Sequence, residues 1–460
     1  MTELAKGEGL RRLAVYAADH HRSLASSVAE KTRACLLYAM AVGVGSMRMK
    51  QPAQAVRVAS GEKDGVATRF FDESRCTPDR AAFANAVLFH SRVQDDAHRA
   101  GHVGVVVVPA AIAVAETAAA SGSTLLSAIA AGYEVALRIG RDHAVDLSSR
   151  GFRTTPAYGV FGAAAAAARL RGLDAEQMAH ALSLAANFAC GLREFAEAGS
   201  EDFPFQAGMA ASNGIVAAQL AAVGATGAAT ALDGAAGFFR AYGKDGVDYA
   251  RRLTEHLGET FEIEGVTYKP YPICQFHRGI VRGSAILRER AKASPLRSLT
   301  VRMHPFEANF YGVRFAGPFE TFPQTFMSAP FCAALAWTRG GATLAELHEF
   351  NAADVLDVVP RIAIEADSAC ARYAPHLTAS LEDGSVLEWH EGEREGAYTL
   401  TWDAAQRMTR SICDEMNLPA ARADDLIAAV AEIDAAPSIG ELVAAMRRAC
   451  TDLRRECQSR

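Results

Sequence analysis

The chain has 460 residues, which is enough for two or three domains with a sizeable core. Its formal net charge is −6 with both signs interspersed, so it lacks the basic footprint of a nucleic-acid-binding protein. The longest apolar stretch, residues 103–115, is too short to span a bilayer, and no secretory signal is recognised at the start. We therefore expect a soluble, cytoplasmic protein with neither nucleic acid nor membrane as a partner.

The first part of the chain, from Leu10 to about Tyr242, has a helical pattern rich in alanine and leucine. Its apolar arcs are wide and its small residues closely spaced, which predicts a tightly packed bundle with helices buried on most sides. The helices are expected at 28–40, 80–89, 109–120, 125–138, 162–171, 175–189 and 208–222.

Near Ser294 the pattern changes. Alternating residues predict strands at 299–303 and 360–366, and Asp383-Gly384 predicts a hairpin within 377–389. Helices are expected between the first two strands, at 328–337 and 344–350. This order indicates a small α+β domain.

Helices return at 424–433 and 439–449, so the tail is expected to pack back on the bundle. The expected fold class is mostly α, with a large helical domain over 1–265, completed by 403–460, and an α+β domain over 266–402.

Nine cysteines are scattered without a Cys-x-x-Cys pair, which predicts reduced, mostly buried thiols. It also argues against an iron–sulfur cluster, which needs three or four grouped thiolates. The cysteines stand at positions 35, 76, 190, 274, 332, 370, 413, 450 and 457.

The strongest candidate for chemistry is the segment 92–102, which carries Asp95, Asp96, His98 and His102 beside an apolar run. Adjacent carboxylates followed by imidazoles can supply a general base, a group that orients it and a proton donor. The alternative is that the acids cap a solvated helix start. A further alternative is a metal site of Asp95, His98 and His102 in a hydrolase.

A second candidate is the glycine-rich segment 151–162, which is expected to be a loop that leads into a helix at Ala163. Its Arg153 and Thr154, with the main-chain N–H groups at a helix start, suit an anion such as a carboxylate. The alternative is an ordinary glycine-rich loop.

The third candidate is the segment 268–277. Its two prolines, Pro270 and Pro272, stiffen the backbone between Lys269 and His277, where the lysine could clamp an anion. A proline-stiffened linker is the alternative.

Taken together, these blocks resemble the MmgE/PrpD, or 2-methylcitrate dehydratase, family over nearly the whole chain. The similar runs lie at 95–111, 151–166, 207–211, 232–238 and 269–277. The resemblance implies a large helical domain built from both chain ends, a smaller α+β lid, a homodimer, and lyase or isomerase chemistry on di- and tricarboxylates without a metal or another cofactor.

The departures from the family pattern concern charged and hydroxyl groups. Where the family usually has histidine the chain has Arg153, and Phe203 and Gln206 replace a lysine and a histidine. Val93 and Ala97 replace an acid and a threonine. These changes predict a substrate with fewer carboxylates, or with a larger apolar part, than methylcitrate or aconitate.

The expected reaction begins with removal of a proton beside a carboxylate, followed by loss of a β group. Asp95, Asp96, His102 and Lys269 are the expected catalytic residues. The expected substrate-binding residues are His98, Arg153, Thr154, Phe203, Gln206, His277 and Tyr311. Epimerisation, isomerisation or decarboxylation on the same scaffold and a repurposed, non-catalytic homologue are the alternatives.

Overall fold

The computed structural model describes residues 5–21, 23–60, 65–292, 294–392 and 397–459. The chain divides into two compact units. The first contains 1–192, 204–268 and 399–460, and the second contains 193–203 and 269–398. The short segment 193–203, placed in the helical domain by the sequence pattern, therefore groups with the second unit.

The first unit is helical apart from a two-stranded ladder, and the mostly α fold class is confirmed. Its helices up to residue 187 are α1 Glu8–Ala18, α2 Ser26–Gly45, α3 Lys50–Val58, α4 Pro78–His90, α5 Gly104–Thr117, α6 Gly122–Gly140, α7 Ala144–Ser149, α8 Thr154–Leu170 and α9 Ala175–Asn187. The later ones are α11 Phe203–Ala222, α12 Phe238–Tyr242, α18 Trp402–Glu415, α19 Ala420–Ala431 and α20 Gly440–Ser459, and the ladder joins β1 Ala67–Thr68 to β2 Arg75–Cys76.

The central helix of this unit is α8, in which every residue is buried. It packs against α5, α6 and α9. A Cβ atom at Gly162 would lie 2.7 Å from the carbonyl oxygen of Gly132 on α6, and one at Gly159 would lie 2.8 Å from Val106 on α5. Glycine is therefore required at these positions by the close approach of the helices.

The predicted loop over 151–162 is wrong, because α8 begins at Thr154 and continues through Gly159 and Gly162. Helical propensity disfavours these glycines, but the packing that they permit outweighs the cost of about 1 kcal/mol for each glycine. The helix expected at 109–120 likewise begins earlier, at Gly104, with Pro109 inside it.

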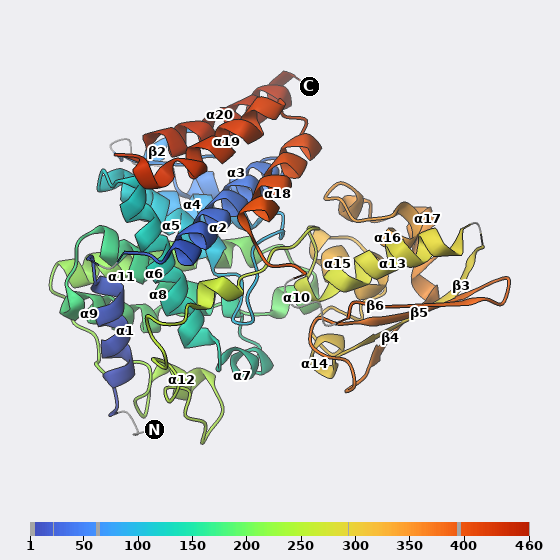
Figure 1. The fold of residues 1–460 in the computed structure, drawn as a ribbon, viewed down its shortest axis with the longest axis horizontal. Helices are drawn as coiled ribbons and strands as arrows, with labels where there is room; N and C mark the ends of the chain where they lie inside the picture. Colours follow the sequence, from blue (N-terminus) through green and yellow to red (C-terminus); the bar gives the residue numbers. More distant parts are fainter. Residues whose placement is uncertain (1–4, 22, 61–64, 293, 393–396, 460) are drawn as a thin grey trace. The chain divides into compact units, whose positions relative to one another are not determined.

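Both ends of the chain contribute to the first unit. In Figure 1 the helices α18 to α20, coloured red, lie beside the blue α2, and α18 and α19 contact α2 directly. Cys413 on α18 and Met446 on α20 belong to the same buried core as Leu36 on α2. The helices predicted in the tail are confirmed: α19 agrees with the prediction within a few residues, whereas α20 continues to Ser459, well beyond the predicted end at 449.

The second unit contains a four-stranded sheet of β3 Leu296–Met303, β4 Ile362–Ala366, β5 His376–Leu381 and β6 Val386–His390. The strand order is β4-β3-β5-β6, with β3 and β4 parallel and the other pairs antiparallel. In register, Leu299 faces Ile362 and Leu377 faces Trp389. The predicted hairpin is confirmed, and Gly384 in its turn has a φ of 86°.

Helices α13 Arg278–Ala291 and α16 Ala329–Arg339 pack against each other, and they contact opposite edges of this sheet. The shorter helices are α10 Glu194–Ala198, α14 Pro305–Ala308, α15 Phe322–Met327 and α17 Ala353–Leu356. The helix predicted at 344–350 is wrong, since only Glu346–His348 forms one turn of 3-10 helix. Thr343 and Glu346 bond to each other there, which favours a tight turn.

Candidate active site

The segment that joins α4 to α5 is buried although it carries several charges. Arg92, Asp95, Asp96 and His98 are all less than one tenth exposed. Such groups are costly to bury without partners, and each has partners within the first unit. The segment is thus a structured element of the core, and the alternative of a solvated helix start is wrong.

The carboxylate of Asp96 is held between two helices. Tyr133, in the middle of α6, donates a hydrogen bond of 2.6 Å from its hydroxyl to Oδ2. A Cβ atom on Gly104, the first residue of α5, would lie 2.5 and 2.7 Å from the two carboxylate oxygens. The carboxylate therefore lies against the positive end of α5, where main-chain N–H groups attract negative charge. Burial, with the charge of Asp96 adding to it, raises the pKa of Tyr133 well above its usual value, so the phenol stays protonated.

The main chain of Asp96 orients the imidazole of His102. Its Nδ1 lies 2.7 Å from the carbonyl oxygen of Asp96, and its main-chain N–H donates to Oγ1 of Thr155 at 3.3 Å. Since a carbonyl oxygen only accepts, Nδ1 carries the proton, and in the neutral ring Nε2 is the basic nitrogen. His102 is half-buried, as a base that must reach a ligand requires.

The carboxylate of Asp95 has a different partner. Its Oδ1 lies 3.0 Å from Nδ1 of His90, the last residue of α4. Nε2 of the same imidazole accepts from Nη2 of Arg153, the residue that precedes α8. Nη1 of Arg153 approaches Oε1 of Gln206 on α11 at 3.5 Å. The structure thus brings together three predicted residues and His90, which the sequence pattern did not single out.

His98 faces another part of the first unit. Its Nε2 lies 3.5 Å from Oε2 of Glu262, and its Nδ1 accepts from the N–H of Ala100 at 3.2 Å. Burial lowers the pKa of His98 to about 4, although the charge of Glu262 opposes this shift. The ring is therefore neutral at pH 7. These contacts give His98 a structural role in fixing the turn that contains Gly101, where a Cβ atom would lie 2.8 Å from Oγ1 of Thr154.

Lys31 and Cys35 on α2 lie close enough to Asp96 for its charge to act on both groups. Lys31 on α2 donates from Nζ to the carbonyl oxygen of Val266, and burial lowers its pKa. Burial also raises the pKa of Cys35, one turn further along α2, to about 12. Its thiol is therefore protonated. All eight described cysteines are free, in agreement with the prediction, whereas the side chain of Cys457 lies outside the described residues.

The remaining predicted residues belong to the second unit. Lys269 and His277 are buried, and burial lowers the pKa of His277 to about 3. Tyr311 is exposed, with 37% of its surface accessible. Phe203 is fully buried, and its ring lies 5.4 and 5.5 Å from the rings of Phe195 and Phe326. Phe203 is therefore part of an aromatic cluster.

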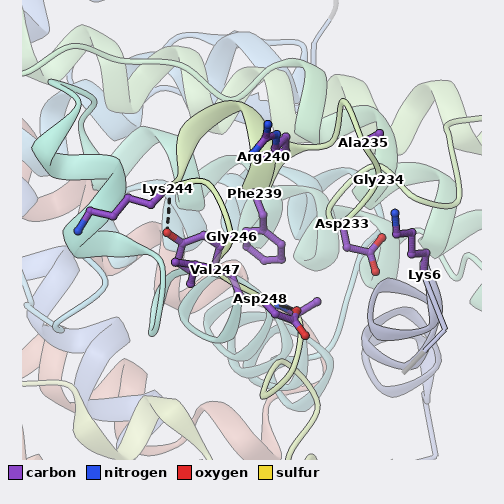
Figure 2. Close-up of a pocket in the computed structure, with 12 residues that line it drawn as sticks. Lys6, Asp233, Gly234, Ala235, Phe239, Arg240, Lys244, Gly246, Val247 and Asp248 are labelled. Atoms are coloured by element: carbon purple, nitrogen blue, oxygen red, sulfur yellow. Dashed lines mark hydrogen bonds between the residues drawn. The ribbon is translucent and has the colours of Figure 1, made fainter. Parts of the chain in front are cut away.

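One cleft of about 200 Å³ in the first unit contains none of the predicted residues (Figure 2). Three of its charged groups have partners nearby: both oxygens of Asp233 accept from the N–H of Gly7, and Lys244 pairs with Asp146 at 2.6 Å. Arg240 pairs with Asp245. These contacts give Asp233, Lys244 and Arg240 structural roles, and no lining residue of the cleft comes from the segment 92–102.

Among the described residues, no group of three or more histidine, cysteine, aspartate or glutamate side chains is arranged to hold a metal ion. Asp95, His98 and His102 thus do not form the ligand set considered above. No helix in the described ranges has both the length and the apolar character needed to cross a membrane.

Comparison with known proteins identifies the class. A family model described as the MmgE/PrpD N-terminal domain matches residues 11–249, more than half of the chain. The protein belongs to the MmgE/PrpD family.

Its curated relatives include cis-aconitate decarboxylases. The protein of Homo sapiens is 28% identical over 305 residues, which cover 63% of this chain and 62% of the relative. That of Mus musculus is 30% identical over 232 residues, 49% and 46% of the two chains. That of Aspergillus terreus is 28% identical over 226 residues, 46% of each. The matched part thus spans between 46% and 62% of the length of these relatives.

Proposed function

We propose that the protein is a lyase that removes a proton beside a carboxylate of a small or partly apolar acid and then expels a β group. The observation that carries this proposal is the hydrogen bond of His102 to the carbonyl oxygen of Asp96. It fixes the tautomer in which Nε2 can accept a proton from carbon. Membership of the family and the names of the relatives support a lyase.

In the proposed reaction the proton moves from the carbon beside the carboxylate to Nε2 of His102. The electron pair that remains forms the new double bond as the β hydroxyl leaves. This hydroxyl takes up a proton from solvent to depart as water, and His102 then releases the proton that it took from carbon to solvent. Arg153 binds a carboxylate, since a guanidinium can hold both of its oxygens. Lys269 stays a candidate for stabilising negative charge, by analogy with the family pattern.

Decarboxylation is the second candidate, and the names of the relatives favour it. In that reaction the electron pair comes from the broken bond to the departing carboxylate, and His102 with its proton on Nε2 supplies hydrogen to the carbon. Epimerisation shares the first proton transfer with elimination. The three reactions thus use the same imidazole, which is a base in elimination and epimerisation and a proton donor in decarboxylation.

The proposal is tested by incubating the protein in D₂O with a panel of acids that includes cis-aconitate, methylcitrate and shorter hydroxy acids. Proton NMR would follow deuterium entering carbon, new vinyl signals and loss of carboxylate. His102→Gln is expected to lower the rate by roughly 10²- to 10³-fold, whereas His98→Gln, in the same segment, should keep it within about tenfold. An unchanged rate in His102→Gln would refute the proposed base.

A further inference from the structure

A chain of three buried side chains runs from Asp95 through His90 to Arg153, all within the first unit. Asp95 and His90 are each 1% exposed and Arg153 is 6% exposed. The imidazole of His90 lies between a carboxylate and a guanidinium. Its Nδ1 contacts Asp95 and its Nε2 contacts Arg153. The resemblance to the family does not explain this arrangement, since the family usually has histidine at the position of Arg153.

The partners determine where the ring proton of His90 lies. A guanidinium has only donors, so Nε2 of His90 must accept from Arg153. The proton is therefore on Nδ1, from which it is donated to Oδ1 of Asp95 at 3.0 Å. A doubly protonated ring would bring two cations into contact in a buried place, which is strongly unfavourable. His90 is thus a neutral link between two opposite charges.

The backbone of Arg153 is fixed as well. Its N–H donates to the carbonyl oxygen of Gly191 at 3.0 Å, and the preceding Phe152 pairs with Leu192 in a β-bridge. Gly191 has a φ of 110°, and a Cβ atom there would lie 2.3 Å from Cγ of Pro156. Only glycine suits this position. The side chain of Arg153 is therefore directed by its main chain at one end and by His90 at the other.

We propose that His90 and Asp95 are positioning residues that hold Arg153 in the orientation needed to bind a carboxylate. The inference rests on the proposed function, which supplies the carboxylate. Asp95 balances the charge of the arginine through the neutral ring, and the planar fork of the guanidinium can contact His90 and a ligand at once. In this arrangement Asp95 influences carboxylate binding through Arg153, whereas Asp96 orients the base, His102.

The tautomer gives a direct test that needs no substrate. Long-range ¹H–¹⁵N spectra of histidine-labelled protein at pH 7 should show His90 as the Nδ1–H form, and Arg153→Gln should change its ring shifts. His143, a buried histidine that contacts Tyr158, is the internal control and should not change. A wild-type His90 in the Nε2–H form would overturn the proposal.

Binding measurements test the consequence. Calorimetry with cis-aconitate, succinate and propionate is expected to show affinity lowered about 10²-fold in Arg153→Gln and about tenfold in His90→Gln and Asp95→Asn. If His90 acts through Arg153, His90→Gln should cause no further loss in the Arg153→Gln background. Arg169→Gln, which removes a buried arginine held by Ala17 and Ser127, controls for loss of packing.

The outcomes separate this inference from the proposed function. Additive losses in the double variant, unchanged affinity in Arg153→Gln, or no binding of any of the three acids to the wild type would each overturn the positioning role. Binding that depends on the three residues, with no proton exchange or elimination in any acid, would uphold it and reject the lyase. Turnover that depends on His102 but not on Arg153 would support the lyase and reject the positioning role of His90 and Asp95.

Discussion

The hydroxyl of Tyr133 donates a 2.6 Å hydrogen bond to the buried carboxylate of Asp96. The tyrosine is on α6 and the aspartate is in the segment before α5, so the bond fixes that segment to the bundle. Because the main chain of Asp96 also orients His102, Tyr133 should influence the base without touching a substrate.

Tyr133→Phe removes this bond and leaves the ring in place. We expect the free energy of unfolding to fall by roughly 1.5–3 kcal/mol, the usual contribution of a hydrogen bond to a charged group, with a lower turnover rate. Urea denaturation and steady-state kinetics measure the two effects. Tyr158→Phe, which removes the bond to His143, is the matched control: it should affect stability and leave turnover nearly unchanged. Equal turnover losses in both variants would contradict the specific role of Tyr133.

Gly104→Ala should disturb the same carboxylate from the other side. The new Cβ atom would lie 2.1 Å from the hydroxyl of Tyr133 and 2.5 Å from Oδ2 of Asp96, so these groups must move. Activity is expected to fall about 10²-fold, as for a catalytic group that is misplaced by an ångström. Gly440→Ala, at the first residue of α20 with its nearest contact at 3.4 Å, should be harmless. Kinetics of the two variants compare the positions directly.

Acid should destabilise the fold through its buried histidines. Burial lowers the pKa of His98 and of His143 to about 4, against an ordinary value of 6.5. The unfolded chain therefore binds more protons than the native one between these values, and the free energy of unfolding should fall by a few kcal/mol as pH decreases from 6.5 to 4. Urea denaturation across this range measures the slope, which should become shallower in His143→Phe. An unchanged slope would show that His143 is not responsible.

Phe203→Lys tests the aromatic cluster of the second unit. The substitution would place an ammonium group among buried rings, and we expect it to cost about 3–5 kcal/mol of stability, as for loss of a buried phenylalanine, and more if the charge is not relieved. Phe203→Leu keeps an apolar side chain and should cost less. Thermal denaturation distinguishes them. If the lysine variant has wild-type stability and prefers more highly charged acids, Phe203 borders a substrate site, as the sequence comparison suggested.

The helical architecture could be predicted because its signal is local. Alanine and leucine periodicity located α2, α4 and α6, and the alternation around Asp383-Gly384 located the hairpin of β5 and β6. The start of α8 could not be found in this way, since Gly159 and Gly162 are breakers by propensity and are retained for contacts with α5 and α6.

The site was only partly predictable for a related reason. Asp95, Asp96 and His102 stand together in the sequence, and their chemistry marks them. Tyr133 lies 37 residues from Asp96, and Arg153 lies 63 residues from His90. A tyrosine inside an apolar helix and a histidine at a helix end look like ordinary core residues until their partners are placed. Contacts between residues far apart in the sequence are set by the packing of the helices, which the local sequence pattern does not reveal.

The contribution of α18 and α19 to the first unit has a consequence for biosynthesis. Helix α2 leaves the ribosome early and is partly covered by α4, α5 and α6, yet α18 and α19, which also pack on it, are not made until after residue 402. Since the surface that α18 and α19 bury stays exposed until then, the nascent chain must carry α2 with one side uncovered through most of its translation. A premature stop codon or a slow stretch of codons late in the message would thus leave α2, one of the first helices to be made, without part of its packing.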